Sequence, residues 1–239
     1  MLIYPAMDLL GGRCVRLSQG RFDAVTRYLT DPAEALAGFA AAGAAWAHVV
    51  DLDGARDRSP RQHELIAELA RNAPLQLQVA GGFRERAHLE LMFEAGVGRV
   101  VIGSLAVQQP QAVREFIGGF GGDRIALALD VNIVEGVPMV ATAGWAETSG
   151  LTLWEVADLY PDARHLLVTD IGRDGMMSGP NLELLAEAVA RLPDLAIQAS
   201  GGIASLDDLP GLPTAGVIIG KALWEQKFTL GEAIRVAGR

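Results

Sequence analysis

The chain has 239 residues, close to the roughly 250 residues typical of one (β/α)8 barrel. Half of the residues are hydrophobic and 6 % are aromatic, a composition typical of a globular protein with a large aliphatic core. The net charge of −9 argues against a nucleic-acid partner, because nucleic-acid binding needs a basic surface. It is compatible with a phosphorylated metabolite, since backbone N–H groups bind phosphate without a net positive charge.

The cysteine content and the N-terminus indicate the compartment. The single cysteine, Cys14, cannot form a disulfide within the chain, which favours a reducing cytoplasm. The first residues lack the basic start of a signal peptide, and the charged residue Asp8 follows at once. No apolar run reaches the roughly 18 residues of a membrane span. We therefore expect a cytoplasmic protein without a membrane partner.

Short apolar runs alternate with amphipathic stretches along the whole chain. Uninterrupted runs rich in branched apolar residues are typical of parallel strands buried on both faces. The expected strands are Leu2–Met7, Ala47–Val50, Leu75–Val79, Arg99–Ile102, Ile125–Leu129, His165–Val168, Leu195–Ala199 and Gly216–Ile219. The first expected helix is capped by Asp31 and ends at Gly43; the others cover Arg61–Arg71, Glu85–Glu94, Gln111–Phe116, Thr152–Leu159, Leu182–Arg191, Leu206–Leu209 and Leu230–Ala237.

Eight such units predict an α/β protein that folds as one (β/α)8 TIM barrel over residues 1–239, with an open doubly wound sheet as the alternative. Three landmarks also recur after about 120 residues, which predicts an internal duplication of half-barrels at about 1–122 and 123–239. The recurring pairs are Gly81-Gly82 with Gly201-Gly202, Gly103 with Gly220, and Asp8 with Asp130.

The repeated glycines follow the third, fourth, seventh and eighth expected strands, where a barrel carries its active-site loops. Glycine adopts positive φ and lets backbone N–H groups approach an anion. Because the two pairs of strands lie half a circumference apart, we expect a small-molecule substrate with a phosphate at each end. A single Gly-Gly pair is equally typical of a tight turn, but two symmetric sets favour phosphate. The predicted phosphate-binding residues are Gly81, Gly82, Gly103, Ser104, Gly201, Gly202, Gly220 and Lys221.

Two aspartates stand at opposite points of the predicted barrel mouth. Asp8 and Asp130 follow the first and fifth expected strands. Opposed carboxylates suit general acid–base catalysis, in which one is protonated and the other ionised, provided that their surroundings separate their pKa values. In the alternative interpretation each carboxylate only caps nearby loop N–H groups. The same residue at the same point of both halves favours catalysis.

The remaining polar candidates are less distinctive. Thr169 ends the sixth expected strand and Asp174 lies in the loop after it, where either a role near the ligand or loop capping fits. His48, on the second strand, points into the barrel or packs against a helix; the sequence favours packing, and we also count His48 among the candidate substrate-loop residues. The histidines show no paired spacing and Cys14 has no partner, so we expect no metal site.

Several segments, in order along nearly the whole chain, resemble the phosphoribosylformimino-aminoimidazole-carboxamide ribotide isomerases of histidine biosynthesis. The most specific lies at Thr169–Asn181. The others are Pro5–Leu9, Val49–Ala55, Gly220–Leu223 and Lys227–Leu230. The resemblance implies an Amadori rearrangement of a substrate with two phosphoribosyl ends, without a cofactor. We expect a monomer.

The resemblance also implies roles for individual residues. Asp8 matches the family's proton acceptor and Asp130 its proton donor, while Thr169 and Asp174 match auxiliary positions near the reacting sugar. Arg84, and Trp145 in a long loop over Val131–Gly150, match residues that cover the ligand.

One turn departs from the family pattern. Ala80 and Phe83 stand where the family usually has Gly and Ile, which restricts the turn and alters the packing behind it.

Three other functions stay open at this stage. A sister cyclase of the same pathway shares the barrel, the phosphate turns and both aspartates, although its motifs after the second strand and near the C-terminus differ. A dual-substrate isomerase would also rearrange phosphoribosylanthranilate. A non-catalytic phosphoribosyl-binding protein would bind the ligand without turnover, which the retention of Asp8 and Asp130 argues against.

Overall fold

The computed structural model describes residues 1–18, 20–142, 145 and 147–238. Its centre is a closed barrel of parallel strands, in which β7 pairs with β10 to complete the circle, as the sequence predicts. Around the barrel the strands run β1 (Leu2–Leu10), β4 (Trp46–Asp51), β5 (Gln76–Ala80), β6 (Arg99–Ile102), β7 (Ile125–Val134), β10 (His165–Asp170), β11 (Ala196–Ser200) and β12 (Gly216–Ile219). The alternative of an open doubly wound sheet is therefore wrong.

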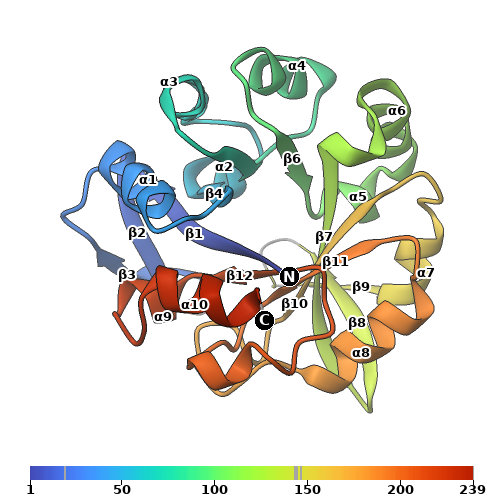
Figure 1. Ribbon diagram of the computed structural model, residues 1–239. Coiled ribbons are helices and arrows are strands. Elements are labelled where there is room, and N and C mark those ends of the chain that lie inside the picture. Colours follow the sequence, from blue (N-terminus) through green and yellow to red (C-terminus); the bar gives the residue numbers. More distant parts are fainter. Residues whose placement is uncertain (19, 143–144, 146, 239) are drawn as a thin grey trace.

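Helices surround the strands (Figure 1), and the N-terminal amine lies beside the last helix, 3.5 Å from the carbonyl of Ala237. The expected helices correspond to α1 (Pro32–Ala41), α3 (His63–Asn72), α4 (Arg86–Glu94), α6 (Pro110–Phe120), α7 (Leu153–Asp158), α8 (Leu182–Arg191) and α10 (Leu230–Ala237). Asp31 caps α1 through the N–H groups of Ala33 and Glu34, as expected. The expected helix at Leu206–Leu209 is instead a short 3-10 turn, η2 (Leu206–Asp208).

Four short elements were not expected from the sequence. The helices α2 (Leu52–Asp57), α5 (Leu105–Gln108) and α9 (Lys221–Trp224) each follow a barrel strand, and the 3-10 turn η1 (Gly122–Arg124) precedes β7. Each has six residues or fewer, too short to show an amphipathic period in the sequence.

Two antiparallel hairpins extend opposite strands of the barrel beyond its mouth. Strand β1 continues into β2 (Arg13–Ser18) and β3 (Arg21–Arg27), and β7 continues into β8 (Val137–Thr142) and β9 (Glu147–Thr152). The predicted loop over 131–150 is therefore wrong, because most of it is sheet. Both first turns have two residues with positive φ, Gly11-Gly12 and Glu135-Gly136, the geometry that matches the twist of a hairpin.

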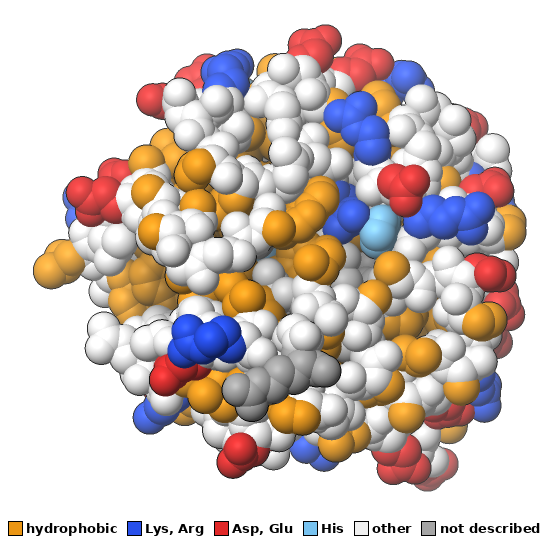
Figure 2. Space-filling view, viewed as in Figure 1, with side chains coloured by type: hydrophobic (Ala, Val, Ile, Leu, Met, Phe, Trp, Pro, Cys, Tyr) orange, Lys and Arg blue, Asp and Glu red, His pale blue; other side chains and the backbone are white. Residues whose placement is uncertain are grey.

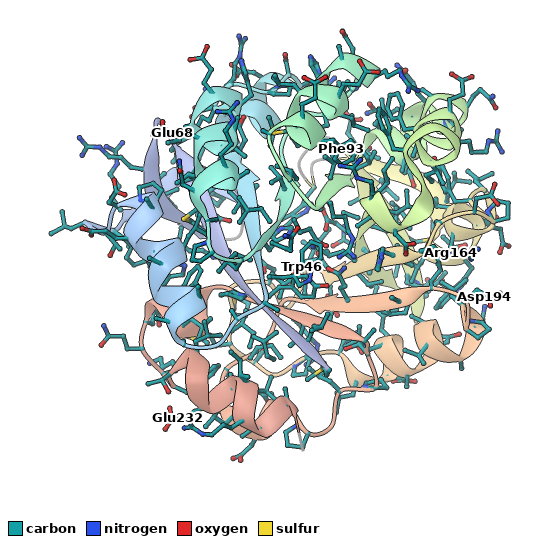
Figure 3. All side chains as sticks on the ribbon, turned by 45° about the horizontal axis from the view of Figure 1, so that its top comes forward. Trp46, Glu68, Phe93, Arg164, Asp194 and Glu232 are labelled. Carbon is teal, nitrogen blue, oxygen red and sulfur yellow. The ribbon has the colours of Figure 1, made fainter. Side chains whose placement is uncertain are left out.

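The main apolar core lies between the barrel and the helices. A second, smaller apolar cluster, formed by Tyr4, Ala6, Leu167 and Ile218, fills part of the barrel interior. The interior is otherwise polar, with Gln78 and Gln198 almost fully buried. At the N-terminal end the guanidinium of Arg99 lies 4.6 Å from the ring centre of Trp46, which Figure 3 shows near the middle of the ribbon, whereas Glu68 and Asp194 lie at its periphery.

The surface carries mixed charge. On the face seen in Figure 2, acidic and basic side chains are interspersed around the rim, and hydrophobic side chains gather toward the middle. Among the described residues, no helix has both the length and the apolar character to cross a membrane.

Candidate active site

Asp8 and Asp130 occupy opposite strands of the barrel, β1 and β7, at the point where each strand leaves the barrel and enters its hairpin. Asp8 is paired with Val50 of β4 on one side and with Val15 of β2 on the other. Asp130 is paired with Thr169 of β10. Both aspartates therefore lie at the C-terminal end of the barrel, the end that forms active sites in this fold.

Asp8 is held by a cation. Its Oδ2 accepts a hydrogen bond from Nη1 of Arg16 at 3.1 Å. The other terminal nitrogen of Arg16, Nη2, lies 3.3 Å from both carboxylate oxygens of Asp174. The three side chains are largely buried, with exposed fractions of 10 % for Asp8, 19 % for Arg16 and 14 % for Asp174. The hairpin strand β2 thus brings one guanidinium between the carboxylate of Asp8 on β1 and that of Asp174 in the loop after β10.

Asp130 has neutral partners. The indole Nε1 of Trp145 donates to Oδ2 of Asp130 at 2.8 Å, and the hydroxyl of Thr169, on the neighbouring strand, also hydrogen-bonds its carboxylate. Trp145 has a positive φ of 75°. Its ring packs against Gly20 of the other hairpin, where a Cβ atom would lie 3.1 Å from Cζ3. The two hairpins therefore meet above the mouth, at a residue that contacts Asp130.

The surroundings of the two carboxylates differ in their charge. Burial raises the pKa of Asp8 above its ordinary value, and the adjacent Arg16 opposes that rise. Burial also raises the pKa of Asp130, which is opposed only by the hydrogen bonds from Trp145 and Thr169. The charge of Asp174 raises both pKa values further. Asp8 is therefore the carboxylate with a charge partner, and Asp130 is the one without.

The predicted phosphate turn of the second half lines a pocket at the barrel mouth. Gly201 and Gly202 both have a φ of 88°, so their conformation requires glycine. Gly220, which the sequence groups with them, has a φ of −106° and needs no such freedom. The ammonium of Lys221 donates to the carbonyl of Gly175 at 2.8 Å. The pocket is lined by Ala6, Arg16, Asp174, Gly175, Met177, Ser200, Gly201, Gly202, Ile203, Ile218, Gly220 and Lys221.

The first-half turn has the same backbone form. Gly81 and Gly82 have φ values of 128° and 75°, whereas Gly103 lies outside the positive-φ region. Ser104 directly precedes α5. Arg84 follows the turn and donates to Oε1 of Gln108 from both terminal nitrogens at 3.2 Å.

The residues that depart from the family pattern fit this turn. Ala80 is the last residue of β5, and Phe83 is buried in the main core with 5 % exposure. The larger side chain at position 83 thus faces the core behind the turn.

A different pair of aspartates performs the capping that was the alternative role for Asp8 and Asp130. Oδ2 of Asp51, at the end of β4, accepts the N–H groups of Arg61 and Gln62 at 2.7 and 2.9 Å. Oδ1 of Asp170, at the end of β10, accepts the N–H of Gly172 at 3.0 Å. Because this work falls to the neighbouring strands, Asp8 and Asp130 stay directed at the mouth.

His48 lies in the barrel interior and not in a substrate loop. Its Nδ1 is 3.1 Å from Nε2 of Gln78, which in turn bonds Gln198 on the opposite strand. The prediction that His48 packs against a helix is therefore wrong, and burial lowers its pKa to about 4. Within the described residues, no group of three or more His, Cys, Asp or Glu side chains is placed to hold a metal ion.

Arg16 is the site residue that the sequence analysis missed. An arginine on an unexpected strand gives no motif of its own. A signal was nevertheless present, because Gly11-Gly12 shortly after a predicted strand is typical of a two-residue hairpin turn. A hairpin at this turn returns its second strand beside Asp8.

Comparison with known proteins agrees with this geometry. A family profile described as "Histidine biosynthesis protein" matches residues 2–229. The chain belongs to this family. A relative from Maricaulis maris is 48 % identical over 239 residues, and one from Alteromonas mediterranea is 47 % identical over 239 residues; each alignment covers 98 % of both chains.

A third relative, from Elusimicrobium minutum, is 42 % identical over 240 residues and covers 99 % of this chain and 100 % of its own. Each of the three carries the name of an isomerase of an imidazole-4-carboxamide that bears two 5-phosphoribosyl groups. This member of the histidine biosynthesis family is accordingly an isomerase.

Proposed function

We propose that the chain catalyses the aldose–ketose isomerisation for which its relatives are named, an Amadori rearrangement of the bis-phosphoribosyl imidazole-carboxamide ribotide. The observation that carries this proposal is the contrast between the two opposed carboxylates. Asp8 is paired with the guanidinium of Arg16, and Asp130 receives only neutral hydrogen-bond donors.

This contrast supports an assignment of acid and base. A neighbouring cation favours the ionised form of a carboxyl group, so the pairing with Arg16 supports Asp8 as the general base. A buried carboxyl without a cation keeps its proton to higher pH, so Asp130 is the general acid. The sequence resemblance implies the same roles.

The chemistry needs one proton donor and one proton acceptor on opposite sides of the sugar. Asp130 protonates the ring oxygen of the aminoaldose, whose bond to C1 breaks as a Schiff base forms. Asp8 then removes the proton from C2, and the resulting enolamine tautomerises to the aminoketose. Thr169 and Trp145 orient Asp130, while Asp174 and Arg16 position Asp8. Each proton transfer contributes about 10²–10⁴-fold in rate.

The ends of the substrate are held by the glycine turns of the two halves. The turns at Gly81-Gly82 and Gly201-Gly202 present positive-φ backbone, in which consecutive N–H groups converge on an anion. Arg84 adds a cation at the first turn and Lys221 at the second. We propose that a monomer carries out the reaction without a cofactor, since every group invoked belongs to one chain. The buried free thiol of Cys14 supports a reducing cytoplasmic location.

Steady-state conversion of the aminoaldose ribotide to its ketose tests the proposal, with phosphoribosylanthranilate assayed in parallel. Turnover of the ribotide alone is the expected result. Turnover of both substrates would extend the activity to the dual-substrate type. Binding of the ribotide by the folded protein without turnover would overturn the proposal in favour of a binding protein or the related cyclase.

A further inference from the structure

The turn between β1 and β2 is tied down by two side chains from a neighbouring part of the barrel. The N–H of Gly12 donates to Oε1 of Gln62 at 2.6 Å, and the N–H of Gly11 donates to Oδ2 of Asp53 at 2.7 Å. In a two-residue hairpin turn these N–H groups point away from the ladder. Both are here bound by side chains that follow β4, so the hairpin is fixed to the barrel from outside.

The amide of Gln62 has each of its polar atoms engaged in hydrogen bonds. Its Nε2 donates to the carbonyl of Leu9 at 2.9 Å and to Oδ1 of Asp51 at 3.1 Å, while its Oε1 accepts from Gly12. The side chain is buried, with the residue 9 % exposed. Leu9 directly follows the proposed base, and Asp51 is fully buried. Gln62 therefore links the ends of β1 and β4 to the turn between β1 and β2.

The position of Arg16 depends on the Gly11–Gly12 turn. Arg16 is on β2, three residues beyond the first residue paired after the turn, and its guanidinium sits between Asp8 and Asp174. We propose that Gln62, with Asp53, is a positioning residue of the reaction: it fixes the Gly11–Gly12 turn and so holds Arg16 against Asp8. This inference rests on the proposed role of Asp8 as the base.

The equivalent place in the second half of the chain lacks such a bridge. Asn181 donates to Oδ2 of Asp170 at 2.7 Å, but its other amide atom, Oδ1, accepts from Leu184 of its own helix. The amide in the second half thus stays local, whereas Gln62 reaches another strand. The two hairpins also differ in charge, because among the described residues the first-half hairpin alone brings a cation to its carboxylate.

The test is the pH profile of kcat/KM, whose acid limb reports the ionisation of the base in the free enzyme. The charged groups that face Asp8 are Arg16 and Asp174. Cys14 and Tyr28 are also close enough for the charge of Asp8 to raise their pKa values. We expect Arg16→Met to move the acid limb up by about one pH unit and Gln62→Met by about half a unit. The double variant moves no further than Arg16→Met alone, because Gln62 acts through Arg16.

Gln198→Met is the matched control, since it removes another buried amide, one whose hydrogen bonds go to Gln78 and not to the hairpin or Arg16. We expect it to lower Tm and leave the acid limb in place. A Gln62→Met limb that does not move, or a shift that adds fully to that of Arg16→Met, would overturn the inference. If Gln62→Met does not fold, Asp53→Ala removes the other anchor of the turn and has the same expected direction.

A second readout separates this inference from the proposed function. The pKa of Asp8 followed by carboxyl-carbon NMR on the unliganded protein needs no substrate. A higher Asp8 pKa in Gln62→Met would support the positioning role even if the wild type failed to convert the ribotide. An unchanged pKa in an active enzyme would reject the positioning role alone.

Discussion

Gln78 and Gln198 exchange two hydrogen bonds through the middle of the barrel, from Nε2 to Oε1 at 2.8 Å in one direction and 3.0 Å in the other. They lie on the diametrically opposed strands β5 and β11, 120 positions apart. Each stands at the centre of its strand, three residues before the first glycine of a predicted phosphate turn. The two halves of the chain thus form hydrogen bonds with each other through glutamines at corresponding positions.

The pair is not symmetric in its further contacts, which predicts unequal costs. Oε1 of Gln78 also accepts from Arg99 at 3.0 Å, and its Nε2 also contacts His48. We expect Gln198→Met to lower the free energy of unfolding by about 1–3 kcal/mol. We expect Gln78→Met to lower it more, because this change also removes one of the acceptors of the buried Arg99 guanidinium, whose Nη1 then keeps only the hydroxyl of Tyr4 among the partners described. Urea unfolding measures both. Equal losses would show that Arg99 finds another partner.

Asp8→Asn and Asp130→Asn are each expected to lower kcat by about 10²–10⁴-fold. The affinity for the bisphosphate ligand should stay within about one order of magnitude, because the proposed function assigns phosphate binding to the glycine turns and not to the aspartates. Calorimetric titration and steady-state kinetics measure the two quantities separately. Turnover that survives undiminished in either variant would remove that aspartate from the mechanism.

Trp145→Phe is expected to move the alkaline limb of the pH–rate profile to higher pH. The indole hydrogen bond favours the ionised form of Asp130, so its loss raises the pKa of this carboxyl. Since Asp130 acts in its protonated form, activity then persists to higher pH. Trp154→Phe is the matched control, because this tryptophan lies on α7 and stacks with Arg191. A downward shift of the limb would contradict the assignment of Asp130 as the acid.

Asp130→Asn is expected to stabilise the protein at pH 7. Burial raises the pKa of Asp130 above its ordinary 3.8, so the folded protein binds this proton more tightly than the unfolded chain. The wild type consequently loses free energy of unfolding as the pH rises from below 3.8 through the folded-state pKa. We expect an advantage for the variant of about 1 kcal/mol or more at pH 7 that shrinks toward pH 4. Thermal unfolding across this range checks the trend, and an advantage that grows toward low pH would refute it.

Arg84→Ala is expected to raise KM about tenfold and to change kcat much less. Its guanidinium, which donates to Gln108 beside the first glycine turn, is proposed to bind substrate and transition state equally through its charge. Arg86→Ala is the control, since Arg86 lies two residues further on and pairs with the exposed Glu90. If both variants had the same KM as the wild type, the first turn would bind its anion through the backbone alone.

The order of the barrel was predictable because its signal is local. Apolar residues predominate in each barrel strand, and longer helices show caps such as Asp31. The hairpins were not predicted, because β3 and β9 are largely exposed or half-buried and lack the apolar pattern of a core strand. These outer strands are held by pairing with β2 and β8, which are in turn paired with β1 and β7.

For the site, residues at strand ends were predictable and residues that depend on hairpins were not. Asp8 and Asp130 were placed correctly because strand order alone sets them on opposite sides of the mouth. Whether a side chain such as Arg16 meets a carboxylate depends on hairpin register, which a single sequence does not specify. The orientation of His48 failed for a related reason, since a half-apolar histidine fits either face of a strand.

The residues at the barrel mouth come from two kinds of element, the barrel strands and the hairpins that extend β1 and β7. Asp8 and Asp130 lie on strands of the closed barrel, in which each strand is fixed by pairing with two neighbours. Arg16 and Trp145, which affect the pKa values of these carboxylates, lie in the hairpins. The hairpins can vary in length or sequence while the barrel strands keep their register. Exchanging a hairpin would therefore change the partners of Asp8 or Asp130 and leave both carboxylates at their places in the barrel.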